Sequence, residues 1–167
     1  INDKTNFVEF CKLNKVDMVI IGPEKPLVDG LVNFLTYNEI LCFGPNKFNA
    51  KIEGCKIFSK CCMLEQNILT ANYKIVSNYA EAIKYISTVK CNEIVIKEPG
   101  LASGKGVYLP KNYDEANDIL KLIYMNSNYK NDIMIEERLI GEEISVLGFC
   151  NGTDVFLMPQ TQDYKRI

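Results

Sequence analysis

The segment best suited to chemistry is a glycine-rich loop that begins at Lys97 and ends at Gly106. A β-prone run ends in Lys97, and glycines follow at Gly100, Gly104 and Gly106. Glycine allows positive φ and removes the side chain, so several backbone N–H groups can converge on one anion. Lys97 and Lys105 add positive charges for phosphate oxygens. The loop therefore predicts a phosphate-binding site.

This loop differs from the two most familiar phosphate loops. The Gly100 to Gly104-Lys105 spacing is one residue short of a Walker A loop, and Gly106 stands where Ser or Thr would bind Mg²⁺. No G-x-G-x-x-G is present, so the segment is not a Rossmann fingerprint. A glycine-rich hairpin turn with solvated lysines remains the alternative interpretation. The β-prone stretch Val107–Leu109 after the loop and the second lysine favour anion binding.

Composition limits the chemistry that is available. The chain has seven cysteines and no histidine, and no two cysteines have C-x-x-C spacing, so no metal site is predicted. The absence of histidine excludes Ser-His-Asp and Cys-His catalysis. Any reaction must therefore use lysine, arginine, carboxylates and backbone amides. Reduced cysteines are typical of cytosolic proteins, so a cytoplasmic location is predicted.

Length and charge exclude several classes of partner. With 167 residues, the chain suits one ordinary domain or two small ones. A formal charge of −2 gives no indication of nucleic-acid or acidic-membrane binding. No apolar run approaches the roughly 20 residues of a membrane helix, and no signal peptide is predicted. The chain lacks an initiator Met, which favours an excised segment.

The elements that would position the loop alternate along the first part of the chain. Helices are predicted over Asn6–Leu13, Pro26–Tyr37, Glu53–Glu65, Ser77–Ser87 and Asn112–Met125. Two of them have candidate N-caps, at Ser77 and at Asn112, and Asn112 stands at capping-box spacing from Glu115. Short β-branched runs predict strands over Asp17–Ile21, Leu41–Phe43, Glu93–Lys97, Asp132–Glu136, Ile144–Cys150 and Val155–Met158. The alternation predicts an α/β class.

The order of elements changes within the chain. After Asp132 the predicted pattern is strand, turn, strand, and Asn151-Gly152 is a hairpin signal, so this part should be antiparallel. The Gly44-Pro45 pair ends a strand and predicts a domain boundary. Residues 1–45 would then be one unit and residues 46–167 another.

Three segments together resemble the ATP-grasp superfamily. Ile94–Val107 resembles the family's glycine-rich loop, which covers the ATP phosphates, and its strand-ending lysine, here Lys97, contacts them. Lys56, at the start of a helix, resembles the first ATP lysine. Ile135–Ile144 resembles the hinge, where adenine lies against the backbone and a carboxylate holds the ribose hydroxyls. The resemblance implies ATP contacts in this hinge at Glu136, Glu137, Leu139, Glu142 and Glu143.

Two further segments narrow the resemblance to the phosphoribosylamine–glycine ligases. Ile20–Gly30 resembles a loop of that family's N-terminal domain, and Gln162–Arg166 resembles its Gln-Asp-His-Lys-Arg sequence. The resemblance implies substrate binding at Gly22, Pro23, Glu24 and Asp163, and catalytic roles for Lys97, Lys165 and Arg166. Residues 1–45 would be the C-terminal part of an N-terminal βαβ domain. Residues 46–167 would be the first part of an ATP-grasp α+β domain.

The chain departs from the family pattern at three places. Tyr164 stands where the family has His, and Glu98-Pro99 precedes the loop glycine, where Pro99 removes a backbone donor. The family's later segment, with its Mg²⁺-binding Glu and Asn, is not in this sequence. The Mg²⁺ ligands are therefore expected beyond Ile167, and the isolated chain is expected to be inactive.

The resemblance implies a function in de novo purine biosynthesis. ATP would activate the glycine carboxylate to glycyl phosphate, and the amine of 5-phosphoribosylamine would attack it. The implied partners are these small molecules, ATP and Mg²⁺, with no nucleic acid or membrane, and the chain could belong to a longer multifunctional protein. The alternatives are another ATP-grasp carboxylate–amine ligase, or a nucleotide-binding module without turnover of its own.

Overall fold

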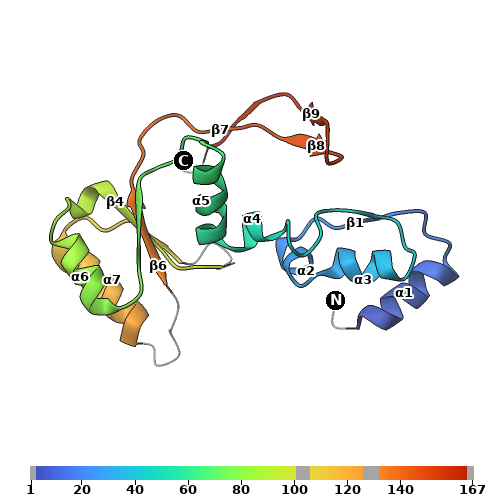
Figure 1. Cartoon of the computed structure of the whole chain (residues 1–167), viewed down its shortest axis with the longest axis horizontal. Coiled ribbons are helices and arrows are strands. Elements are labelled where there is room, and N and C mark those ends of the chain that lie inside the picture. The colour runs from blue at the N-terminus through green and yellow to red at the C-terminus, as the bar shows by residue number, and fades with distance from the viewer. Residues whose placement is uncertain (1–2, 101–105, 126–131, 165–167) are drawn as a thin grey trace.

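The structure is a computed structural model that describes residues 3–100, 106–125 and 132–164. Figure 1 shows an elongated molecule with an N-terminal lobe at one end, a sheet lobe at the other, and helices α4 and α5 between them. Both helices and sheets are present, and the predicted α/β class is confirmed. Among the described residues, no helix is long and apolar enough to cross a membrane.

The N-terminal lobe is a small α/β unit. Parallel strands β1 and β2 pair Val19 with Cys42, and the helices pack around a core that includes Leu31 and Leu35. The elements are α1 (Lys4–Leu13), β1 (Val19–Ile20), α2 (Glu24–Val28), α3 (Leu31–Tyr37) and β2 (Cys42–Phe43). The parallel pair with helices between its strands is the expected βαβ arrangement.

The predicted single helix over Pro26–Tyr37 is wrong. Gly30 adopts φ +81°, ψ +31°, which ends α2 and begins α3. This left-handed conformation costs little for glycine and breaks the helical path. The start is also earlier than predicted, because Pro23 is the N-cap of α2 and Glu24 lies in its first turn.

Two short helices join the lobes. They are α4 (Lys51–Gly54) and α5 (Lys56–Glu65), where one helix over Glu53–Glu65 was predicted. Cys55 is extended, with φ −142° and ψ +103°, so it ends α4 and forms the N-cap of α5. A Cβ built on Gly54 would lie 2.6 Å from Cγ2 of Val28. The absence of a side chain there lets α4 pack closely against α2.

The sheet lobe contains a four-stranded sheet in the order β3-β6-β4-β5, in which all neighbours are antiparallel. Its strands are β3 (Tyr73–Val76), β4 (Ile94–Lys97), β5 (Val107–Tyr108) and β6 (Ile133–Glu137). Strand β3 was not predicted. One face packs on α6 (Tyr79–Ile86) and α7 (Tyr113–Met125), with a 3₁₀ turn (Cys91–Glu93) before β4.

The N-caps of α6 and α7 were both predicted from the local sequence, and the structure agrees with one of the two predictions. The Asn112 side chain accepts from the Glu115 N–H at 2.9 Å, and Glu115 Oε2 accepts from the Lys111 N–H, which confirms a capping arrangement. The predicted N-cap at Ser77 is wrong by one residue. Asn78 caps α6 instead, and its side chain accepts from the Glu81 N–H at 2.9 Å.

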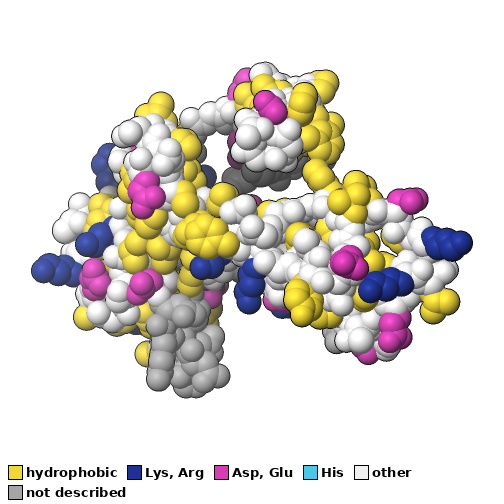
Figure 2. All heavy atoms as spheres, turned by 45° about the vertical axis from the view of Figure 1, so that its right-hand side comes forward, with side chains coloured by type: hydrophobic (Ala, Val, Ile, Leu, Met, Phe, Trp, Pro, Cys, Tyr) yellow, Lys and Arg dark blue, Asp and Glu magenta, His cyan; other side chains and the backbone are white. Residues whose placement is uncertain are grey.

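The last described segment is antiparallel, as predicted. It contains β7 (Ile144–Ser145), β8 (Gly148–Cys150), β9 (Val155–Leu157) and β10 (Thr161–Gln162). Pairs β7–β10 and β8–β9 are antiparallel, so the strand predicted over Ile144–Cys150 is interrupted where the chain changes partner. The β8–β9 turn spans Asn151–Asp154, with Gly152 at φ +103°. Figure 2 shows exposed apolar side chains on this hairpin.

Candidate functional site

A cleft of about 850 Å³ is lined by residues of α4, α5, the start of α2 and the sheet lobe. Its walls include Met63 and Leu69 of the α5 region and Met134 of β6. Its charged lining residues come from both lobes and from the helices between them: Glu24, Lys25, Glu53, Lys56, Lys60, Lys97 and Glu136. Among the residues that line the cleft, lysines therefore outnumber carboxylates.

Strand alternation places charged side chains on the cleft face of the sheet. Glu136 lies opposite Val95 on β4 and opposite Tyr73 on β3, so these three side chains share one face. Lys97 is two residues beyond Val95, which makes it the diagonal neighbour of Glu136. Ile135, the residue before Glu136 on β6, points to the other face and is fully buried in the core. The residue types of β4 and β6 thus match a sheet with one apolar core face and one face on which Lys97 and Glu136 lie among apolar residues.

Glu136 is the buried carboxylate at the centre of this face, with a side chain that is 7% exposed. Its Oε1 forms an ion pair with Lys97 Nζ. Its Oε2 lies 3.2 Å from Lys60 Nζ, which is within ion-pair range, although the two groups are not aligned for a hydrogen bond. One carboxylate is therefore shared between two ammonium groups from different elements.

Lys60 is a site residue that the sequence reasoning missed. Its side chain is 7% exposed, and Nζ donates to Thr70 Oγ1 at 2.5 Å and to the Ala71 carbonyl at 3.0 Å. Nζ also lies 5.4 Å from the centroid of the Tyr73 ring. A signal was available, because Lys60 follows Lys56 by one helical turn and so shares its face of α5.

Lys56 connects helix α5 to the glycine-rich loop. Its Nζ donates to the carbonyl oxygens of Glu98 at 3.0 Å and Gly100 at 2.7 Å. Partial burial lowers the pKa of Lys56, and the nearby charge of Lys97 lowers this pKa further. Gly100 has φ +82°, a conformation that glycine tolerates. The first described residues of the loop are therefore held toward the cleft.

The described ends of the loop form a hairpin between β4 and β5. Lys97 pairs with Val107, and the Glu98 N–H donates to the Gly106 carbonyl at 2.8 Å. The Tyr108 hydroxyl donates to Glu98 Oε1 at 2.6 Å, which raises the pKa of Tyr108 to about 12. The strand–loop–strand prediction is confirmed by this pairing. The predicted phosphate contacts Gly104 and Lys105 lie outside the described residues.

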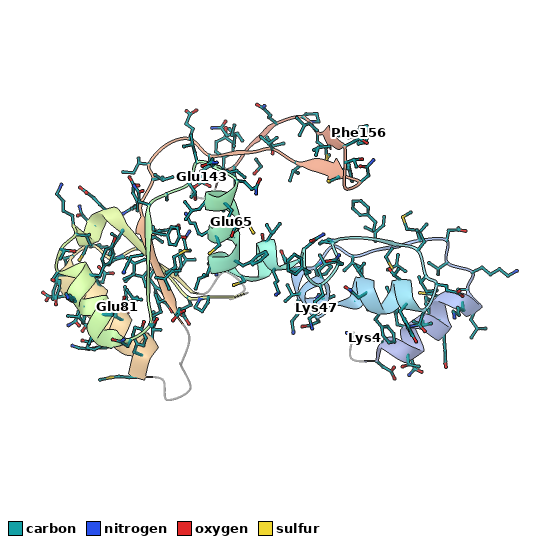
Figure 3. The ribbon with its side chains drawn as sticks, viewed as in Figure 1. Lys4, Lys47, Glu65, Glu81, Glu143 and Phe156 are labelled. Atoms are coloured by element: carbon teal, nitrogen blue, oxygen red, sulfur yellow. The ribbon has the colours of Figure 1, made fainter. Side chains whose placement is uncertain are left out.

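The predicted hinge residues divide between the cleft and its surroundings. Leu139 lines the cleft, together with Glu136. The Glu137 side chain instead accepts from Asn72, from Nδ2 at 3.0 Å and from the backbone N–H at 3.3 Å. Glu142 and Glu143 are exposed and outside the cleft lining. Figure 3 places Glu143 on the segment that passes above α5.

The predicted substrate-binding residues are also divided. Glu24 lines the cleft, whereas Gly22 and Pro23 are exposed beside it and do not line it. The Asp163 N–H donates to the Glu143 carbonyl at 3.0 Å, which joins the end of the described chain to the hinge segment. Tyr164, in the position of the family's His, donates to Gln162 Oε1 at 2.6 Å. Lys165 and Arg166 lie outside the described residues.

The donor set of the cleft fits a polyphosphate. Lys56, Lys60 and Lys97 converge on it, and Lys56 and Lys97 are within reach of its interior without being fully buried. Ammonium groups and backbone amides are the groups that bind phosphate oxygens. Within residues 3–100, 106–125 and 132–164, no group of three or more His, Cys, Asp or Glu residues could hold a metal ion.

Two purine biosynthetic proteins are similar in sequence to the chain over nearly all of its length. It is 41% identical to the bifunctional purine biosynthetic protein purD of Dictyostelium discoideum, over 99% of this chain and 20% of that protein. It is 40% identical to the phosphoribosylamine–glycine ligase of Leptospira interrogans, over 98% of this chain and 39% of that protein. The chain thus spans between a fifth and two fifths of the length of these relatives.

Solved structures agree with this fold. The phosphoribosylamine–glycine ligase of Thermotoga maritima superposes with a TM-score of 0.66 and 34% identity, over 75% of this chain and 32% of that one. The D-alanyl-alanine synthetase A of Vibrio cholerae gives a TM-score of 0.69 at 15% identity, over 88% of this chain and 45% of that one. At 15% identity, the second similarity shows a shared fold alone.

Two family models together match the whole chain. The N domain of phosphoribosylglycinamide synthetase matches residues 1–53. The ATP-grasp (A) domain of the same synthetase matches residues 54–167, which include Lys56, Lys60, Lys97 and Glu136. The chain therefore belongs to the phosphoribosylglycinamide synthetase family.

Proposed function

We propose that this chain supplies the ATP-phosphate site of a ligase that joins glycine to 5-phosphoribosylamine. The main support for the proposal is that Lys56 and Lys97 line one cleft, with the buried Lys60–Glu136 pair beside Lys97, in a chain of this family. The proposed site also includes Gly100, whose carbonyl is held by Lys56. The activity belongs to the protein that contains this chain, in de novo purine biosynthesis.

The proposed reaction has two steps. The glycine carboxylate attacks the γ-phosphorus of ATP, and ADP leaves, which gives glycyl phosphate. The amine nitrogen of 5-phosphoribosylamine then attacks the acyl carbon, inorganic phosphate leaves, and the nitrogen loses a proton to give glycinamide ribonucleotide. Phosphoryl transfer depends on positioning and charge stabilisation more than on a protein nucleophile. A cleft with lysines and no histidine suits that requirement.

The chain's own residues would divide this work by position. Lys97 ends β4 at the base of the loop and would neutralise charge on the transferring phosphate. Lys56 would hold the loop at Gly100 over the phosphates. Lys165 and Arg166 are proposed to hold a phosphate or the acyl phosphate, because Arg binds phosphate in a bidentate manner.

The nucleoside part of ATP is proposed to lie along the hinge. The backbone near Glu137 and Leu139 would contact adenine, and Glu142 or Glu143 would hold the ribose. Leu139 supports this placement, because it lines the same cleft as Lys97. Gly22, Pro23, Glu24 and Asp163 are proposed for the substrate side, and support comes from Glu24, which reaches the cleft from α2.

Other features of the whole protein are also proposals. Mg²⁺ is proposed to accompany ATP, with ligands taken from outside the described residues, since these contain no cluster of carboxylates that would hold it. A boundary near Gly44-Pro45, just after β2, is proposed to divide the two domains. The bifunctional relatives support a longer multifunctional chain. Free cysteines support a cytoplasmic location.

The proposal can be tested with the full-length protein. Labelled glycine, ATP with Mg²⁺ and 5-phosphoribosylamine should give a labelled amide, together with equal amounts of ADP and phosphate. Leaving out glycine should abolish ADP formation and is the control. ADP formation with formate or bicarbonate in place of glycine would indicate another ATP-grasp ligase. ATP binding without any turnover would indicate a nucleotide-binding module and would overturn the proposal.

A further inference from the structure

Lys60 of α5 lines the cleft, but only 7% of its side chain is exposed, so its ammonium group is poorly placed to bind a ligand directly. Lys60 lies behind Glu136 as seen from Lys97, and the two ammonium groups contact different oxygens of the same carboxylate. Lys97 is 26% exposed at its side chain, against 7% for Lys60. Lys97 can therefore turn toward a ligand in the cleft, whereas Lys60 remains with Glu136.

This difference matters when an anion enters the cleft. Lys97 must then share its ammonium group between Glu136 and the anion, or leave Glu136 altogether. A buried carboxylate that loses its only counter-ion carries a large desolvation penalty. With Lys60 Nζ already 3.2 Å from Oε2, a small adjustment of either side chain would align a hydrogen bond there. The charge of Glu136 would stay compensated.

The remaining contacts of Lys60 hold it in this position. An ammonium group has three donors, and two of them are used by Thr70 Oγ1 and the Ala71 carbonyl. The third is left for Glu136. The Tyr73 ring, 5.4 Å from Nζ, adds a favourable cation–π contact on the same face of the sheet. Lys60 therefore has a fixed place, and one of its three donors is left over at 3.2 Å from the shared carboxylate.

We propose that Lys60 is a positioning residue that acts through Glu136: it is the resident counter-ion that frees Lys97 to bind the phosphates of the nucleotide. This inference rests on the proposed ATP site. It predicts that Lys60 affects the phosphate-dependent part of nucleotide binding and leaves the nucleoside part unchanged. A lysine that only supports the fold would affect both parts equally.

The test uses Lys60→Met in the full-length protein, with dissociation constants for Mg-ATP from calorimetry and for adenosine from ligand-observed NMR. ATP should bind about tenfold more weakly, in the range of coupling between residues of one charge network, and adenosine binding should not change. Lys60→Arg keeps the charge and should retain ATP binding more closely. Lys74→Met is the matched control, because Lys74 does not line the cleft. Its Nζ instead lies 3.8 Å from Glu81 Oε1.

A second comparison decides the question even if Lys60→Met fails to fold. In Glu136→Gln, Lys97 is already released, so adding Lys60→Met should change ATP affinity by less than about twofold relative to Glu136→Gln alone. A tenfold loss in that comparison would mean that Lys60 contacts the nucleotide itself and would overturn the proposal. Equal weakening of ATP and adenosine in Lys60→Met would also overturn it. If the unmodified protein binds no ATP, the proposed site itself fails.

Discussion

Replacing Glu136 with Gln should strongly weaken the sheet lobe, because this residue is shared by two lysines. The substitution keeps the shape of the side chain and removes its charge. Lys60, with 7% of its side chain exposed, then loses its ionic partner and keeps only its bonds to Thr70 and Ala71. The side chain of Lys97 is 26% exposed, so it can turn partly toward water.

The expected loss in the free energy of unfolding follows from the different burial of Lys60 and Lys97. Breaking a buried ion pair by removing one partner costs about 3–5 kcal/mol, because the remaining charge is left without compensation. The two hydrogen bonds that Lys60 retains place the expected loss near the lower limit, at about 3 kcal/mol. Lys97→Met should cost less stability, about 1 kcal/mol, because Glu136 still has Lys60 beside it. Lys60→Met combined with Glu136→Gln should restore most of the loss, since no buried charge remains.

The assay is hydrogen exchange of the backbone amides of β4 and β6 in the full-length protein, which reports the free energy of opening of this sheet. Lys74→Met is the control, because its exposed pair with Glu81 at 3.8 Å should contribute almost nothing. A loss below about 1 kcal/mol in Glu136→Gln would refute the reasoning. So would a double variant that is no more stable than Glu136→Gln.

Three further predictions concern the loop, the junction between the lobes and the pH dependence. Lys97→Ala in the full-length enzyme should lower kcat by about 10²-fold or more; unchanged steady-state kinetics would contradict its assignment. Gly54→Ala should lower the free energy of unfolding by about 1–3 kcal/mol, because its Cβ would lie 2.6 Å from Val28 Cγ2; urea unfolding should show recovery when Val28→Ala is added. The raised pKa of Tyr108, from 10.0 to about 12, means that its bond to Glu98 stabilises the fold fully below pH 10 and that this contribution is lost as the pH rises toward 12. Tyr108→Phe should remove that part of the alkaline decline in unfolding midpoint, and an identical decline in both proteins would argue against it.

Several features were predictable from the sequence because they depend on neighbours along the chain. The cap of α7 needs only Asn112 and Glu115 at the correct spacing, and the structure has that hydrogen bond at 2.9 Å. The hairpin around the glycine-rich loop follows from two β-prone runs joined by glycines, and Lys97 pairs with Val107. Lys56 and Lys97 were identified because each belongs to a local sequence pattern of the family.

Other features were missed either because contacts elsewhere in the molecule decide them or because a glycine inside the segment breaks the pattern. Tyr73–Val76 is short and forms a strand because it pairs along its whole length with β6, from Tyr73 opposite Glu136 to Val76 opposite Ile133. Pro26–Tyr37 has a continuous helical pattern, yet Gly30 breaks it at φ +81°. Intrinsic propensity is a weak prior that tertiary contacts override.

The sequence alone established the family pattern, the residue types available for phosphate binding, and the exclusion of histidine chemistry, because these depend on identity and spacing. Only the tertiary structure decided how the charges are combined. It brought Lys60 of α5, Lys97 of β4 and Glu136 of β6 together, although they are separated by dozens of residues. Ion pairing depends on distance and burial in three dimensions, which spacing along a chain does not specify. The same sequence pattern would otherwise describe three solvated side chains.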